Sequence, residues 1–78
     1  MTLNRLPVGK TGRVCALTLT GATRRRLLDL GLIEGTKVAC IRRSPAGDPI
    51  LYYFRDTMIA LRNEDSKHIT VEVVDPCE

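Results

Sequence analysis

Residues 24–49 read RRRLLDLGLIEGTKVACIRRSPAGDP and carry the strongest structural signals of the chain. Basic and helix-forming residues run up to Gly31, the residue type that best tolerates the left-handed backbone at a helix end. A β-branched segment follows the turn at residues 34–35, and the turn formers of residues 44–49 close it. A basic helix, a glycine stop, a strand and a proline-closed turn in this order indicate a binding module and carry no recognisable catalytic set.

Along the whole chain, β-branched and alternating segments predict strands. We expect five, at residues 12–19, 36–43, 50–54, 57–62 and 68–73. A helix over residues 22–30 has Thr20 as its candidate cap, and one helical turn over residues 64–66 has Asn63. Between the third and fourth strands, Arg55 and Asp56 form a tight turn in which Asp56 is the better candidate for a left-handed backbone.

A chain of 78 residues buries one core. Short strands in so small a domain are best closed into a barrel, because closure hides strand edges that would otherwise pair with other molecules. We therefore predict a mostly β fold: a five-stranded, partly open barrel with a short α-helix after the first strand and a single helical turn before the last. The domain spans residues 1–78, with a loose tail at 74–78. The predicted core consists of Val14, Leu17, Leu27, Val38, Ile41, Ile50, Tyr52, Phe54, Ile59, Leu61, Ile69 and Val71.

Several function classes are disfavoured by composition. No apolar run approaches the roughly 20 residues of a spanning helix, and the N-terminus lacks the apolar core of a signal peptide, so we expect a cytoplasmic chain without membrane insertion. Three widely spaced cysteines without a CxxC pair are expected to be free thiols, with Cys15 and Cys40 buried in strands. The absence of a phosphate-binding loop or a nucleophile motif predicts no catalytic residue, no cofactor and no enzyme activity.

The predicted helix has an apolar underside and a basic rim. Its apolar arc holds Leu27, Leu28 and Leu30. Arg25 and Arg26 point away from this arc, and positive charge near a helix N-terminus opposes the macrodipole by about 0.3 to 1 kcal/mol per residue. Because arginine pairs well with carboxylates and is favoured at interfaces, we predict that both contact an acidic partner. The alternative is a solvated helix face.

Arg24 lies inside the apolar arc and suits an internal ion pair with Asp48 or Glu34. The other candidate partner-binding residues also have structural alternatives. Leu30, Leu32 and Ile33 either form an exposed apolar patch for a partner or pack in the core at the helix end. Asp48 and Pro49 belong to a recognition loop or simply satisfy the chemistry of a turn.

The strings RRRLLDLGLIEGTKV, RRSPAGDPI and MIALRNEDSKHITVEV resemble the FeoA family of ferrous iron transport proteins, whose members are small Src-homology-3-like (SH3-like) barrels. The resemblance covers residues 6–74. Its most specific part is the basic residues, Leu27-Leu28, Leu30-Gly31, Gly35, Gly47-Asp48-Pro49 and Ala60-Leu61-Arg62 at these spacings. One departure is Asp56, where many members have glycine.

The resemblance implies a small cytoplasmic accessory or regulatory protein of Fe(II) uptake. It would bind FeoB, a membrane transporter with a cytoplasmic GTP-binding region, and modulate transport by protein–protein contact. Whether its effect activates or inhibits, and whether it forms a weak homo-oligomer, stays open at this point.

Metal binding is the first alternative function. His68 and Glu72 would share a strand face but lie roughly 13 Å apart, so no preformed metal site is predicted. An opportunistic ion held by His68 with Asp75, Cys77 and Glu78 remains an alternative.

The main rival is a nucleic-acid-binding small barrel. It is weakened because residues 52–54 are the only aromatics, and at least two are needed for the core.

Overall fold

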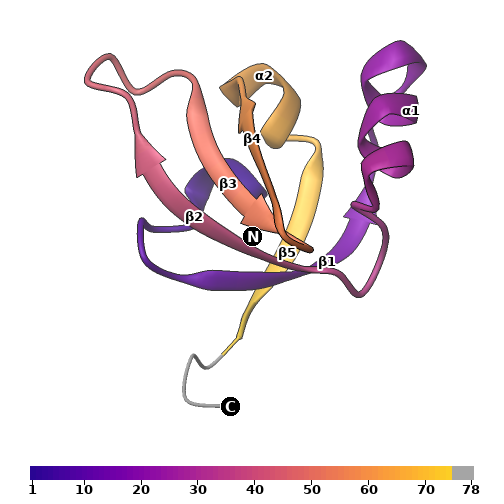
Figure 1. Ribbon diagram of the computed structural model, residues 1–78, viewed down its shortest axis with the longest axis horizontal. Helices are drawn as coiled ribbons and strands as arrows, with labels where there is room; N and C mark the ends of the chain where they lie inside the picture. Colours follow the sequence, from indigo (N-terminus) through magenta and orange to yellow (C-terminus); the bar gives the residue numbers. More distant parts are fainter. Residues whose placement is uncertain (75–78) are drawn as a thin grey trace.

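The computed structural model describes residues 1–74. In chain order its elements are η1 (Leu3–Arg5), β1 (Thr11–Leu17), α1 (Gly21–Leu30), β2 (Lys37–Arg43), β3 (Ile50–Phe54), β4 (Thr57–Leu61), α2 (Asn63–Ser66) and β5 (Ile69–Val74). The strands form one strongly curved antiparallel sheet in the order β4-β3-β2-β1-β5 (Figure 1). The mostly β fold with five strands is confirmed, and each predicted strand is displaced by two residues at most.

Hydrogen bonds account for the end of α1 and for the start of α2. Gly31 closes α1 with a left-handed φ of 100°, and its N–H donates to the carbonyls of Leu27 and Leu28, as the glycine stop predicts. Thr20 occupies the cap position but its hydroxyl caps nothing, so that part of the prediction is wrong. Asn63 is the first residue of α2 rather than its cap, because its amide groups bind the β2–β3 loop instead.

The β3–β4 hairpin turns through two left-handed residues, Arg55 (φ 47°) and Asp56 (φ 62°). The sequence predicted this conformation for Asp56 alone. A two-residue turn with positive φ at both positions matches the right-handed twist of the flanking strands. It fixes the register, in which Phe54 lies opposite Thr57 and Tyr53 opposite Met58.

The core lies between the two halves of the curved sheet. Its fully or nearly fully buried side chains are Leu3, Leu6, Val14, Leu19, Leu27, Leu32, Val38, Cys40, Ile50, Tyr52, Phe54, Ile59, Leu61, Ile69 and Val71. Leu17, predicted to be buried, is only partly covered. Ile41 was predicted wrongly and is 39% exposed. Val38 and Cys40 face the core, so the alternation along β2 places Ile41 on the outer face of the sheet.

The N-terminal segment, to which the sequence assigned no structure, packs beneath the sheet. Leu3 and Leu6 are fully buried. The Tyr52 hydroxyl donates to the Leu3 carbonyl at 3.3 Å. Arg43 Nη2 donates to the carbonyls of Asn4 at 2.8 Å and Leu6 at 3.1 Å. These bonds satisfy carbonyls that the segment would otherwise bury without partners.

Two smaller predictions need correction. Cys15 is exposed, because β1 alternates and turns Val14 inward, whereas Cys40 is buried as predicted. Val74, assigned to the tail, is the last residue of β5 and pairs with Thr11. The rest of the predicted tail and the third cysteine lie outside the described residues.

Candidate partner interface

The helix α1 stands beside the barrel rather than lying flat against it (Figure 1). Leu27 is its one fully buried residue. Leu28 is only half-buried, and Leu30 is 38% exposed. The predicted apolar arc therefore anchors the helix through Leu27 alone, and Leu28 and Leu30 leave apolar surface exposed to solvent.

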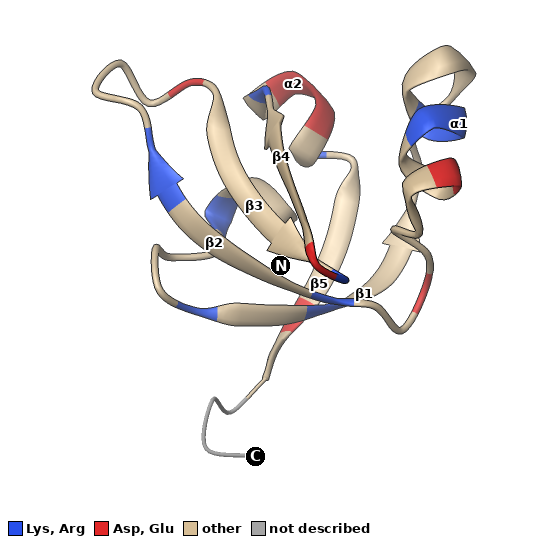
Figure 2. Cartoon of the chain, in the orientation of Figure 1, with Lys and Arg blue, Asp and Glu red and all other residues tan. Residues whose placement is uncertain are grey.

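All three arginines of α1 face solvent, and Figure 2 shows their charge as a band on the helix. None takes part in a side-chain hydrogen bond or ion pair within residues 1–74. The predicted internal pairing of Arg24 is therefore wrong. The side chain lies on the surface, where Arg24 and Arg25 line a shallow groove of about 470 Å³ together with Leu28. This face combines unpaired positive charge with apolar surface.

The structure divides the predicted partner-binding residues. Arg25, Arg26 and Leu30 share α1, and all three are exposed. The loop that carries the exposed residues Asp48 and Pro49 lies on the opposite side of the molecule in Figure 1. The six residues therefore do not form one surface.

Leu32 has to be removed from the predicted partner surface, because it is 0% exposed and belongs to the core. Ile33 and Arg55 extend the α1 surface instead. Ile33, just past the helix end, is 45% exposed. The stem of Arg55 runs along Gly31, with its Cδ 3.2 Å from the place where a side chain would begin. No sequence signal pointed to Arg55, since it reaches the helix only through folding of the distant hairpin.

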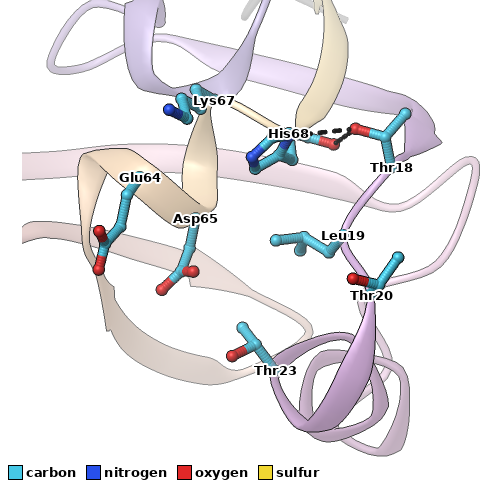
Figure 3. A pocket seen from close by; sticks show the side chains of 8 residues that line it. All are labelled: Thr18, Leu19, Thr20, Thr23, Glu64, Asp65, Lys67 and His68. Atoms are coloured by element: carbon cyan, nitrogen blue, oxygen red, sulfur yellow. Dashed lines mark hydrogen bonds between the residues drawn. The ribbon is translucent and has the colours of Figure 1, made fainter.

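A polar cleft of about 430 Å³ separates α1 from α2. Its lining residues are Thr18, Leu19, Thr20, Thr23, Glu64, Asp65, Lys67 and His68 (Figure 3). His68 lies against one wall, where the Thr18 hydroxyl donates to the His68 carbonyl at 3.0 Å and sits 3.5 Å from Nδ1 of the ring. Within residues 1–74 no group of three His, Cys, Asp or Glu side chains is placed to hold a metal ion. Asp75, Cys77 and Glu78, the alternative ligands, lie outside the described part of the chain.

The aromatic residues are used mainly by the core. Tyr52 and Phe54 are buried, as expected, and Tyr53 is 39% exposed. Burial raises the pKa of Tyr52 to about 12. The hydrogen bond that Tyr53 donates to Asp56 at 2.8 Å raises the pKa of the Tyr53 phenol. A platform of aromatic side chains for stacking bases is therefore missing from the described surface.

The FeoA domain family matches residues 1–73. The chain belongs to this family. A relative from Porphyromonas gingivalis, the Fe(2+) transport protein A/Fe(2+) transporter FeoB fusion protein, is 30% identical over 74 residues. That match covers 95% of this chain and 9% of the fusion protein, so the chain spans only a small part of that relative's length.

Solved structures of FeoA proteins share the fold. The Chlorobium tepidum FeoA protein superposes with a TM-score of 0.91 at 35% identity, over 96% of this chain and 71% of its own. The Stenotrophomonas maltophilia FeoA, solved in complex with zinc and described as a prokaryotic SH3 domain protein, gives a TM-score of 0.79 at 32% identity. That match covers 92% of this chain and 89% of the relative. The family resemblance and the SH3-like fold are thereby confirmed. Among the described residues no helix is long and apolar enough to cross a membrane.

Proposed function

We propose that this FeoA-family chain is a cytoplasmic accessory protein of Fe(II) uptake. It binds the GTP-binding region of a FeoB-type membrane transporter and modulates transport by protein–protein contact. The observation that carries the proposal is the Porphyromonas gingivalis relative, in which a matching segment and a FeoB transporter belong to one chain. Covalent linkage holds two units at high effective concentration, which favours a working contact between them.

The α1 face is the surface that suits this contact best. Arg25 and Arg26 have no ion-pair partner within the described residues, and Leu30 adds exposed apolar area next to them. Arginine binds carboxylates with several donors, and charged rims steer association with surfaces of opposite sign. The expected contact on the transporter is therefore an acidic patch with an apolar centre. The proposed role is regulatory and assigns no catalytic step to the arginines.

Binding of the purified chain to the isolated GTP-binding region of its cognate transporter tests the proposal. Calorimetry should show complex formation, and Arg25→Glu plus Arg26→Glu should weaken it by about tenfold or more, since like charges then face each other. The matched control is Lys10→Glu plus Arg42→Glu, which changes net charge equally at exposed sites off the helix. Its affinity should stay within about twofold of the parent chain.

Three results would contradict the proposal in different ways. Absence of binding by the parent chain would remove the transporter contact altogether. Equal weakening by both double variants would show a contact that depends on net charge, with no role for α1. Tight binding of single-stranded nucleic acid with a steep salt dependence would favour the rival function instead.

A further inference from the structure

Strand β4 ends the sheet, and one of its edges has no neighbouring strand. The two-residue turn makes Phe54 and Thr57 a hydrogen-bonded pair, and pairs alternate along an antiparallel ladder. The backbone N–H and C=O groups of Met58 and Ala60 therefore point away from β3. No other described residue bonds to them. The edge presents free donors and acceptors spaced as a further strand requires.

The residues of β4 include none of the types that discourage pairing at a sheet edge. Its sequence, TMIAL, contains no charge, no proline and no glycine. The sheet face beside it is apolar as well: Met58 is 55% exposed, and its cross-strand neighbour Tyr53 is 39% exposed. The next pair on this face, Leu51 and Ala60, lines a groove of about 340 Å³ together with Arg42, Ser44 and Pro49.

Opposite charges flank this neutral edge. Asp56 precedes β4 and accepts a hydrogen bond from Tyr53, which holds its carboxylate on the outer face. Arg62 follows β4 in an extended conformation with φ −77° and ψ 154°. It is exposed and takes part in no ion pair within the described residues. In an antiparallel pair of two β4 strands centred on Ile59, Asp56 of each copy lies opposite Arg62 of the other. A parallel pair would place like charges together, which is unfavourable.

We propose that β4 is a self-association site, at which two copies of the chain pair their β4 strands antiparallel about a twofold axis at Ile59. Met58 and Ala60 exchange backbone hydrogen bonds with Ala60 and Met58 of the second copy, and the two apolar outer faces become continuous. The contact is small and therefore belongs to the weak, reversible class of interfaces. It uses a different element from α1, so it stands independently of the proposed transporter contact.

Sedimentation of the full chain up to about 1 mM tests the self-association. The apparent mass should rise with concentration toward that of a dimer. Ala60→Pro removes an outward N–H without breaking a hydrogen bond of the sheet, and prolines are tolerated on edge strands. The variant should therefore keep the circular dichroism spectrum of the parent chain but show no rise of apparent mass with concentration. Arg25→Glu plus Arg26→Glu is the control and should dimerise as the parent chain does.

A mixing experiment tests the register. Asp56→Lys alone and Arg62→Glu alone each place like charges at both ends of the paired strands, and each should self-associate at least about fivefold more weakly. An equimolar mixture of the two variants restores both ion pairs and should give heterodimers at the parent level by native mass spectrometry. Asp56→Asn, which suits the left-handed turn and is neutral, should show a smaller loss.

A parent chain that stays monomeric at the highest concentration overturns the proposal and leaves the edge to an extended segment of another protein. A mixture that associates no better than its separate components also overturns it. In that case any dimer uses a different register or a different surface.

Discussion

The carboxylate of Asp48 accepts a hydrogen bond of 2.8 Å from the backbone N–H of Asn63. The Asn63 side chain returns a bond of 3.1 Å from Nδ2 to the Gly47 carbonyl. Together these bonds join the β2–β3 loop to the start of α2. The first N–H groups of a helix have no partner within the helix, so Asp48 caps α2 from a distant part of the chain. Its first role is therefore structural.

Replacing this cap should lower stability. Asp48→Ala removes the acceptor for the Asn63 N–H and should reduce the free energy of unfolding by about 1 kcal/mol. For a domain of this size that corresponds to a melting temperature lower by about 4 to 8 °C. Thermal unfolding followed by circular dichroism measures it. Asp29→Ala is the control, because Asp29 is exposed and takes part in no described hydrogen bond. Equal melting temperatures for the two variants would contradict a capping role.

The order of strands and helices could be predicted from the sequence because local signals agree with the fold. Gly31 stops α1 where a left-handed residue is required, and Ile69 and Val71 of β5 face the core as their alternation predicts. Beyond them the alternation fails, because Val73 is exposed and Val74 is buried.

The η1 segment could not be predicted locally, because it is held by bonds from Tyr52 and Arg43, both far along the chain. Ile41 was assigned to the core wrongly, although its alternation with the buried Val38 and Cys40 places it on the outer face.

The candidate site was predicted less well for the same reason. A helical wheel orders residues around the axis but does not say how closely the helix approaches the sheet. Arg24 was therefore assigned an internal partner, although α1 stands away from the barrel and the side chain is exposed. Leu32 and Ile33 are adjacent in sequence, yet one is fully buried and the other is 45% exposed. That division depends on the path of the chain after Gly31.

Gly31 should be the least replaceable glycine of the helix–strand connection. A Cβ at Gly31 would lie 3.2 Å from Arg55 Cδ, and the φ of 100° strains any other residue. Gly35 has a φ of 90° but open space around it, so Gly35→Ala isolates the backbone strain. Gly35→Ala should lower the free energy of unfolding by about 1 kcal/mol, and Gly31→Ala should lower it by more. Urea unfolding measures both.

The variant Gly31→Ala plus Arg55→Ala separates the two causes. Removing the Arg55 side chain should abolish the part of the stability loss at Gly31 that exceeds the loss at Gly35, so that only the cost of backbone strain remains. Failure of the double variant to recover stability would show that contact with Arg55 contributes nothing.

Leu27 should hold α1 against the barrel. Leu27→Ala deletes the one fully buried side chain of the helix and should cost about 2 to 4 kcal/mol. Leu30→Ala, at a position 38% exposed, should cost less than about 1 kcal/mol. Hydrogen exchange should show faster exchange of α1 amides in the Leu27 variant. Equal effects at both positions would contradict a single-residue anchor.

Tyr52 should make stability depend on pH in alkaline solution. Burial raises its pKa from 10.0 to about 12, so the folded chain keeps the phenol proton after the unfolded chain has released it. The resulting stabilisation is fully present below pH 10.0 and is lost as the pH rises through about 12. Tyr52→Phe lacks this titration and also leaves the buried Leu3 carbonyl without its 3.3 Å hydrogen bond.

Below pH 10.0 we therefore expect Tyr52→Phe to be less stable than the parent chain by about 1 kcal/mol or more. Above that pH the difference should shrink, because only the parent chain loses the stabilisation. Urea unfolding at a series of pH values measures the difference, and Tyr53→Phe controls for the exposed phenol. A deficit that stays constant across the alkaline range would contradict the raised pKa of Tyr52.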